Sequence, residues 1–133
     1  MSLPKHTVQD FYTASPFTVD GDDNVDRAQE LMSSKGIRHL PVTSAGKLVG
    51  VLSDRDIKTA LTFKGASSKR LRCADLCTED VYVTHRDSPL AAVAAELASK
   101  HYGSAVVTER EEVVGIFTTT DACRALSEVL TAG

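Results

Sequence analysis

The hydrophobic and polar positions in the first half of this chain predict a strand, a helix, two more strands and a second helix. Segments of the length and residue type found in strands lie at 17–19, 38–43 and 47–52. The last two segments are separated by three small residues, Ser44, Ala45 and Gly46, which are typical of a hairpin turn. We therefore expect an antiparallel hairpin after the first helix.

The helices are predicted from the spacing of apolar residues and from their capping residues. Apolar side chains recur at helical spacing between Val25 and Met32, and Gly36 is placed to end this helix. Ser53 is placed to cap a second helix that runs to Leu61. The candidate N-cap residues of the first helix are Asp22, Asp23 and Asn24.

The second half of the chain repeats this order. Strands are predicted at 81–84, 105–108 and 113–117, and a final helix begins near Thr120. The helix between the first two strands is expected to have Ser88 as its N-cap and Pro89 at its first position. Its buried face would consist of Leu90, Val93, Ala94 and Leu97.

The two halves are copies of one unit. An offset of 65 residues aligns 8–61 with 73–126 without a gap, and twelve of the 54 aligned pairs are identical. Residues 7–61 therefore form the first repeat, 62–72 a polar linker, and 73–126 the second repeat. About fifty residues bury too little surface to be stable alone. The expected fold class is α/β (α+β), with two βαββα repeats packed sheet to sheet about a pseudo-twofold axis.

Composition and charge exclude several classes of partner. The 133 residues carry a net charge of −3, so no basic excess draws the chain onto nucleic acid. No apolar run is long enough to cross a membrane, and the first ten residues lack the apolar core of a signal peptide. The three cysteines have no paired CxxC spacing and the four histidines are scattered, which favours a reducing compartment and no metal site. We therefore expect a cytoplasmic protein.

One motif, G-h-h-[ST]-x-x-D, occurs in both repeats where a strand meets a helix, at 50–56 and 115–121. The free N–H groups of a helix N-terminus attract an anion. An aspartate one turn into the helix can accept hydrogen bonds from the two hydroxyls of a ribose. The alternative is purely structural: Ser53 and Thr118 would be N-caps, with Asp56 and Asp121 completing capping boxes.

These motifs resemble those of a tandem pair of cystathionine-β-synthase (CBS) domains, also called a Bateman module. The resemblance covers 7–126. It rests on segments that lead into and surround the predicted strands, namely 7–13, 17–19, 36–42, 48–56 and 114–121. It implies a nucleotide-binding regulatory module that binds AMP, ADP, ATP or S-adenosylmethionine in clefts between the repeats, with no obligatory cofactor.

Matched residue by residue, the resemblance also implies a role for each site residue. Asp56 and Asp121 would hold ribose hydroxyls, while Ser53 and Thr118 would approach ribose or phosphate. Thr18 and Val83 would line the base pocket, and Arg55 would add positive charge for phosphate. The residues before the second strand of each repeat would face phosphate and base: Arg38 and His39 in the first repeat, and Tyr102, Gly103 and Ser104 in the second. His39 has an equally simple interpretation as a half-buried strand residue.

The second repeat departs from the pattern. It lacks the basic pair that Arg38 and His39 form in the first repeat, and Thr119 and Thr120 replace Asp54 and Arg55. A polyphosphate should therefore favour the first cleft, and the second should prefer a nucleoside or stay empty.

The sequence bears on three classes of function. The resemblance favours a sensor that signals through a homodimer to a regulated partner protein encoded elsewhere. The alanine-rich helix faces have two interpretations, close helix contacts in that homodimer or burial within one chain. Enzymatic activity is not expected, because the chain has no nucleophile elbow, HExxH or GxxxxGK[ST] motif. The alternative is a structural dimerisation module with vestigial or empty clefts.

Overall fold

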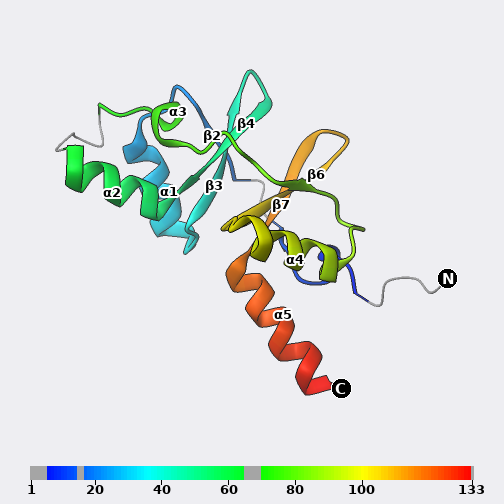
Figure 1. The fold of residues 1–133 in the computed structure, drawn as a ribbon. Coiled ribbons are helices and arrows are strands. Elements are labelled where there is room, and N and C mark those ends of the chain that lie inside the picture. The colour runs from blue at the N-terminus through cyan, green and yellow to red at the C-terminus, as the bar shows by residue number, and fades with distance from the viewer. Residues whose placement is uncertain (1–5, 15–16, 65–69, 133) are drawn as a thin grey trace. The chain divides into compact units, whose positions relative to one another are not determined.

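A computed structural model describes residues 6–14, 17–64 and 70–132 (Figure 1). The chain divides into two compact units. We call residues 17–81 the first unit, and residues 1–16 together with 82–133 the second unit. Each unit has its own sheet and its own buried core.

The first unit contains the predicted β-α-β-β-α order. Its three-stranded sheet has the order β2-β3-β4, with β2 parallel to β3 and β3 antiparallel to β4. Buried side chains of α1, β3, β4 and α2 form one core together with Cys73 from α3. The elements are β2 (Val19–Asp20), α1 (Val25–Lys35), β3 (His39–Ser44), β4 (Lys47–Ser53), α2 (Asp54–Lys64) and α3 (Cys73–Leu76).

The residues predicted to begin and end the first helix of this unit do so, and the predicted hairpin forms. Asn24 is the N-cap of α1, and its side chain accepts a hydrogen bond from the amide of Arg27 at 3.1 Å. Gly36 ends the helix in the left-handed conformation, with φ of 65°. The hairpin turn is one residue shorter than predicted, because Ser44 pairs with Lys47 in the sheet. Ala45 and Gly46 form the turn, and both have positive φ, which matches the twist of the flanking strands.

The second unit has the same order and adds two elements from the N-terminal end of the chain. Its sheet has the order β1-β7-β6-β5, in which β1 pairs antiparallel with β7. Both hairpins shift register at the same place, between Val42 and Thr43 and between Val107 and Thr108. The elements are a 3₁₀ helix η1 (Val8–Asp10), β1 (Thr13–Ala14), β5 (Val83–Thr84), α4 (Leu90–Lys100), β6 (Ser104–Glu109), β7 (Glu112–Thr118) and α5 (Thr119–Ala132).

The prediction that Ser88 caps α4 was wrong. The N-cap position is occupied by Pro89, and no side chain caps it. The Ser88 hydroxyl instead accepts hydrogen bonds from the Thr84 hydroxyl at 2.8 Å and from the amide of His85 at 3.2 Å. The first amide of α4, from Leu90, donates to the carbonyl of His6 at 3.0 Å. A distant segment therefore satisfies the helix terminus, and the serine stabilises the preceding turn instead.

The segment that leads into each repeat packs on the other repeat. Residues 8–14 belong to the second unit, whereas Cys73–Leu76 and the residues that follow it belong to the first. Thr78 pairs with Val51 as an isolated bridge, just as Thr13 pairs with Ile116. These pairs are related by the 65-residue offset, so the exchange is reciprocal.

The two motif glycines allow these lead-in segments to approach closely. A Cβ atom on Gly115 would lie 2.5 Å from the carbonyl oxygen of Thr13 and 2.5 Å from the ring of Tyr12. A Cβ atom on Gly50 would lie 2.7 Å from the sulfur of Cys77. The glycine of the repeated motif is therefore required because a chain segment crosses directly over it.

The predicted linker is only partly described. Helix α2 extends to Lys64, three residues beyond the predicted end at Leu61, and residues 65–69 lie outside the described part of the chain. At its other end, Leu71 packs against the core of the first unit and its carbonyl accepts a hydrogen bond from the amide of Val25 at 2.8 Å. Among the described helices, none combines the length and the apolar composition needed to cross a membrane.

Candidate functional site

In the first unit, the candidate site is built where β4 ends and α2 begins. Ser53 is the last residue of β4, and its hydroxyl accepts a hydrogen bond from the amide of Asp56 at 3.0 Å. Ser53 is therefore an N-cap, which confirms that part of the structural interpretation. The Asp56 carboxylate is half-buried, and no hydrogen bond or ion pair to it is found among residues 6–14, 17–64 and 70–132. It remains able to accept hydrogen bonds from a ligand.

The neighbouring strand brings two predicted residues to this junction. His39 opens β3 and lies directly opposite Ser53 in the sheet. Arg38 precedes it, and its carbonyl accepts a hydrogen bond from the amide of Asp54 at 2.8 Å. Sheet pairing and the helix terminus thus place Arg38 and His39 beside the start of α2.

The electrostatics of His39 reflect this placement. Burial lowers the pKa of the imidazole from its ordinary value of 6.5, the negative charge of Asp56 opposes this shift, and the positive charge of Arg38 adds to it. His39 is therefore favoured in its neutral form near pH 7. A neutral imidazole can both donate and accept a hydrogen bond, so His39 offers polar recognition without a fixed charge.

The remaining predicted residues of the first unit are less closely joined to this group. Thr18 is half-buried just before β2, and Arg55 is exposed on the first turn of α2. Arg38 also lines a polar groove of about 480 Å³ beside the end of α1, together with Asp54 and Lys58. The last two form an ion pair at 2.9 Å.

In the second unit, the equivalent aspartate is buried and engaged. Asp121 is only 3% exposed. The Thr118 amide donates to its carboxylate at 3.0 Å, and its own amide donates to the Thr118 hydroxyl at 3.2 Å, which forms a complete capping box. The Thr13 hydroxyl also donates to this carboxylate, at 3.1 Å, and the Arg124 guanidinium pairs with it. The two repeats thus place the same residue type in different surroundings.

The other predicted residues of the second unit surround the start of β6. Ser104 is buried and lies opposite Thr118, and the carbonyl of Gly103 accepts a hydrogen bond from the amide of Thr119 at 3.2 Å. Tyr102 stacks on Tyr82 with ring centroids 5.6 Å apart. Val83 is 44% exposed on β5.

Two residues at the site of the second unit were not predicted from the sequence. Thr13 and Arg124 both contact the Asp121 carboxylate. The position of Arg124 three residues after Asp121 on a helix is a spacing at which side chains meet, so this pair could have been found. Thr13 lies 108 residues from Asp121 in the sequence, and only its identity with Thr78 at the repeat offset marks it.

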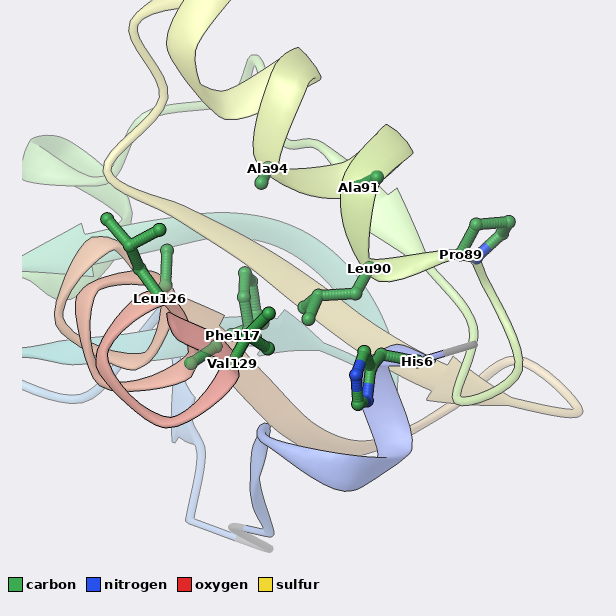
Figure 2. Close-up of a pocket in the computed structure, with 10 residues that line it drawn as sticks. His6, Pro89, Leu90, Ala91, Ala94, Phe117, Leu126 and Val129 are labelled. Atoms are coloured by element: carbon green, nitrogen blue, oxygen red, sulfur yellow. The ribbon is translucent and has the colours of Figure 1, made fainter. Parts of the chain in front are cut away.

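An apolar groove of about 390 Å³ lies between α4 and α5 of the second unit (Figure 2). Leu90, Ala91 and Ala94 of α4 form one side, and His6 lies at the edge. The other side is formed by α5, through Ala122, Ala125, Leu126 and Val129. Leu126 is 59% exposed and Leu130, one turn further along α5, is 71% exposed. Alanine and leucine side chains of α4 and α5 therefore line a surface that is not covered within the described part of the chain.

Comparison with known proteins agrees with this architecture. A family model described as the CBS domain matches residues 8–62 and again residues 73–128. The chain belongs to the CBS domain family. The two matched stretches coincide with the two repeats related by the 65-residue offset.

Two solved CBS structures contain adenosine compounds. The CBS domain pair of protein MJ0100, in complex with 5′-methylthioadenosine and S-adenosyl-L-methionine, is 27% identical, with a TM-score of 0.83, and the match covers 94% of this chain and 98% of that one. CBSX2 in complex with AMP is also 27% identical, with a TM-score of 0.74 and coverage of 93% and 98%. These similarities establish this chain as a CBS domain pair.

A curated relative is much longer than the CBS pair. L-aspartate semialdehyde sulfurtransferase of Methanocaldococcus jannaschii is 31% identical over 126 residues. The match covers 93% of this chain and 24% of that protein. This chain therefore spans about a quarter of that relative, and the similarity is confined to the CBS portion.

Proposed function

We propose that this CBS pair is a regulatory module that senses an adenosine-containing ligand, an AMP-like nucleotide or S-adenosylmethionine, and has no catalytic chemistry of its own. The observation that carries the proposal is the Asp56 carboxylate, half-buried at the N-terminus of α2, to which no hydrogen bond or ion pair is found in the described part of the chain. Support comes from the two CBS pairs of similar fold that hold S-adenosylmethionine, 5′-methylthioadenosine or AMP.

The chemistry of the junction suits such a ligand. A carboxylate can accept hydrogen bonds from both hydroxyls of a ribose, and a helix N-terminus favours a phosphate or carboxylate group. In this proposal the Asp56 carboxylate accepts hydrogen bonds from the ribose hydroxyls. Arg38 and Arg55 supply positive charge for the phosphate or carboxylate group of the ligand, and Thr18 contacts the base. Val83, Tyr102, Gly103, Ser104, Thr118 and Asp121 are the corresponding residues of the second unit.

A thermal-shift screen tests the proposal. The purified protein is heated with AMP, ADP, ATP, S-adenosylmethionine, NAD and cyclic dinucleotides. A ligand present at one hundred times its Kd adds about 2.7 kcal/mol to the free energy of unfolding, which raises the Tm measurably. Asp56→Ala should abolish the shift. Asp54→Ala is the matched control, because it removes the same charge from the same helix turn and should keep the shift.

No shift with any of these ligands would contradict the sensor proposal. A structural dimerisation module would then be the better account. The uncovered groove between α4 and α5 favours that alternative, since it supplies an association surface that needs no ligand.

We also propose that the sensor works as a homodimer, in which the α4 and α5 faces of two copies cover each other and pass the ligand signal to a partner protein. Support comes from the exposed Leu126 and Leu130 on α5. Analytical ultracentrifugation of Leu130→Glu should show a monomer. Glu128→Lys, at an exposed position on the opposite side of the same helix from Leu126 and Leu130, should remain dimeric. A monomeric wild-type protein would refute this part of the proposal.

A further inference from the structure

The two motif aspartates differ in how many hydrogen-bond acceptor positions they have left. An ionised carboxylate offers about four such positions. At Asp121 four protein donors already point at the two oxygens: the Thr13 hydroxyl, the amide and hydroxyl of Thr118, and the Arg124 guanidinium. The side chain is also 4% exposed, so solvent and ligand have almost no access to it.

The equivalent donors are not in place in the first unit. The repeat offset makes Thr59 the counterpart of Arg124, and Thr59 carries no positive charge. The counterpart of Thr13 is Thr78, which is exposed and makes no hydrogen bond to Asp56 among the described residues. Asp56 therefore keeps the acceptor positions that Asp121 has lost.

From this asymmetry we infer that the protein binds one adenosine ligand per chain, in the first unit, and that Thr13 and Arg124 close the ribose site of the second unit by occupying Asp121. A ribose donates two hydroxyl hydrogens, so binding at Asp121 would displace two of the four donors. Displacing Arg124 would also leave a buried carboxylate without its cation, which is strongly unfavourable. This inference rests on the proposed function and assigns it to one of two equivalent positions.

Because the two repeats align, the arginine that closes the second site can be introduced at the equivalent position of the first repeat. Thr59 is exposed on α2, three residues after Asp56, so Thr59→Arg places a guanidinium at the position that Arg124 has relative to Asp121. In isothermal titration calorimetry with AMP, the wild-type protein should bind one equivalent. Thr59→Arg should weaken that binding by roughly tenfold or more.

A matched control separates this effect from a general change in charge. Thr62→Arg adds the same charge to the same exposed helix at a spacing that does not meet Asp56, and should leave AMP binding unchanged. Conversely, the double variant Thr13→Val/Arg124→Ala frees two acceptor positions on Asp121 and should bind a second equivalent of AMP. A wild-type protein that binds two equivalents, or a Thr59→Arg variant with unchanged affinity, would overturn the inference.

A second measurement requires no ligand and keeps the two proposals distinguishable. In a double-mutant cycle of Asp121→Asn and Arg124→Ala, the losses in urea midpoint should be non-additive, because both substitutions remove the same pair. The cycle of Asp56→Asn and Thr59→Ala should be additive. Additive losses at Asp121 would refute the closed site. Failure of AMP and the other ligands to bind would refute the proposed sensor function, and with it ligand binding in the first unit, but would leave the closure of Asp121 standing.

Discussion

Substitution of Gly115 by alanine tests whether the N-terminal segment presses on β7 as the structure shows. The added Cβ would lie 2.5 Å from the Thr13 carbonyl oxygen and 2.5 Å from the Tyr12 ring, about 1 Å closer than ordinary van der Waals contact. The carbonyl belongs to the backbone of β1, so the strand itself must move. Gly115 is not in the left-handed region, and steric contact is therefore the dominant cost.

The magnitude follows from two opposing terms. Adding a methyl group to a well-packed site costs about 1–3 kcal/mol. Replacing glycine by alanine restricts the unfolded chain and returns about 0.4–1 kcal/mol. We expect a net loss of about 1–2 kcal/mol in the free energy of unfolding, and more if the movement of β1 also weakens the Thr13–Asp121 hydrogen bond.

Urea denaturation followed by circular dichroism measures this loss directly. Glu112→Ala is the matched control, because Glu112 is exposed at the start of the same strand and its removal should change stability little. Gly50→Ala should be destabilising for the same reason, through contact with Cys77 and Thr78. A Gly115→Ala protein as stable as the wild type would show that the lead-in segment does not lie on β7.

Three further predictions concern protonation, thiol reactivity and turn strain. Because burial lowers the pKa of His39, the unfolded chain binds more protons than the folded chain between pH 6.5 and the lowered pKa. The free energy of unfolding should therefore fall as the pH drops through this window. His39→Gln should flatten this part of the stability profile, and an unchanged profile would contradict the burial. Burial raises the pKa of Cys73 to about 11, so at pH 8 a thiol reagent should label exposed Cys123 and react with Cys73 only after unfolding. Equal labelling rates for the two cysteines in the folded protein would refute this. Arg110 and Glu111 both have positive φ in a two-residue turn, so an Asn-Gly replacement should raise the free energy of unfolding by about 1 kcal/mol, and a lower Tm would argue against that turn conformation.

Local signals determined most of the secondary structure. The N-cap at Asn24, the left-handed stop at Gly36 and the hairpin at Ala45–Gly46 could all be read from the sequence, because each depends on residues within a few positions. Ser88 was misassigned because a turn and a helix terminus compete for the same hydroxyl, and the carbonyl of distant His6 decides the outcome.

The sequence by itself determined the duplication, the order of elements in each repeat and the two strand-to-helix junctions, because periodicity and capping are properties of short stretches of chain. Only the tertiary structure decided which lead-in segment covers which sheet, and how Asp56 and Asp121 differ. That difference depends on Thr13, which lies 108 residues from Asp121 and meets it only when β1 pairs with β7. Two copies of one motif therefore have different chemistry, because the hydrogen-bond capacity of a carboxylate is set by every donor the fold brings to it.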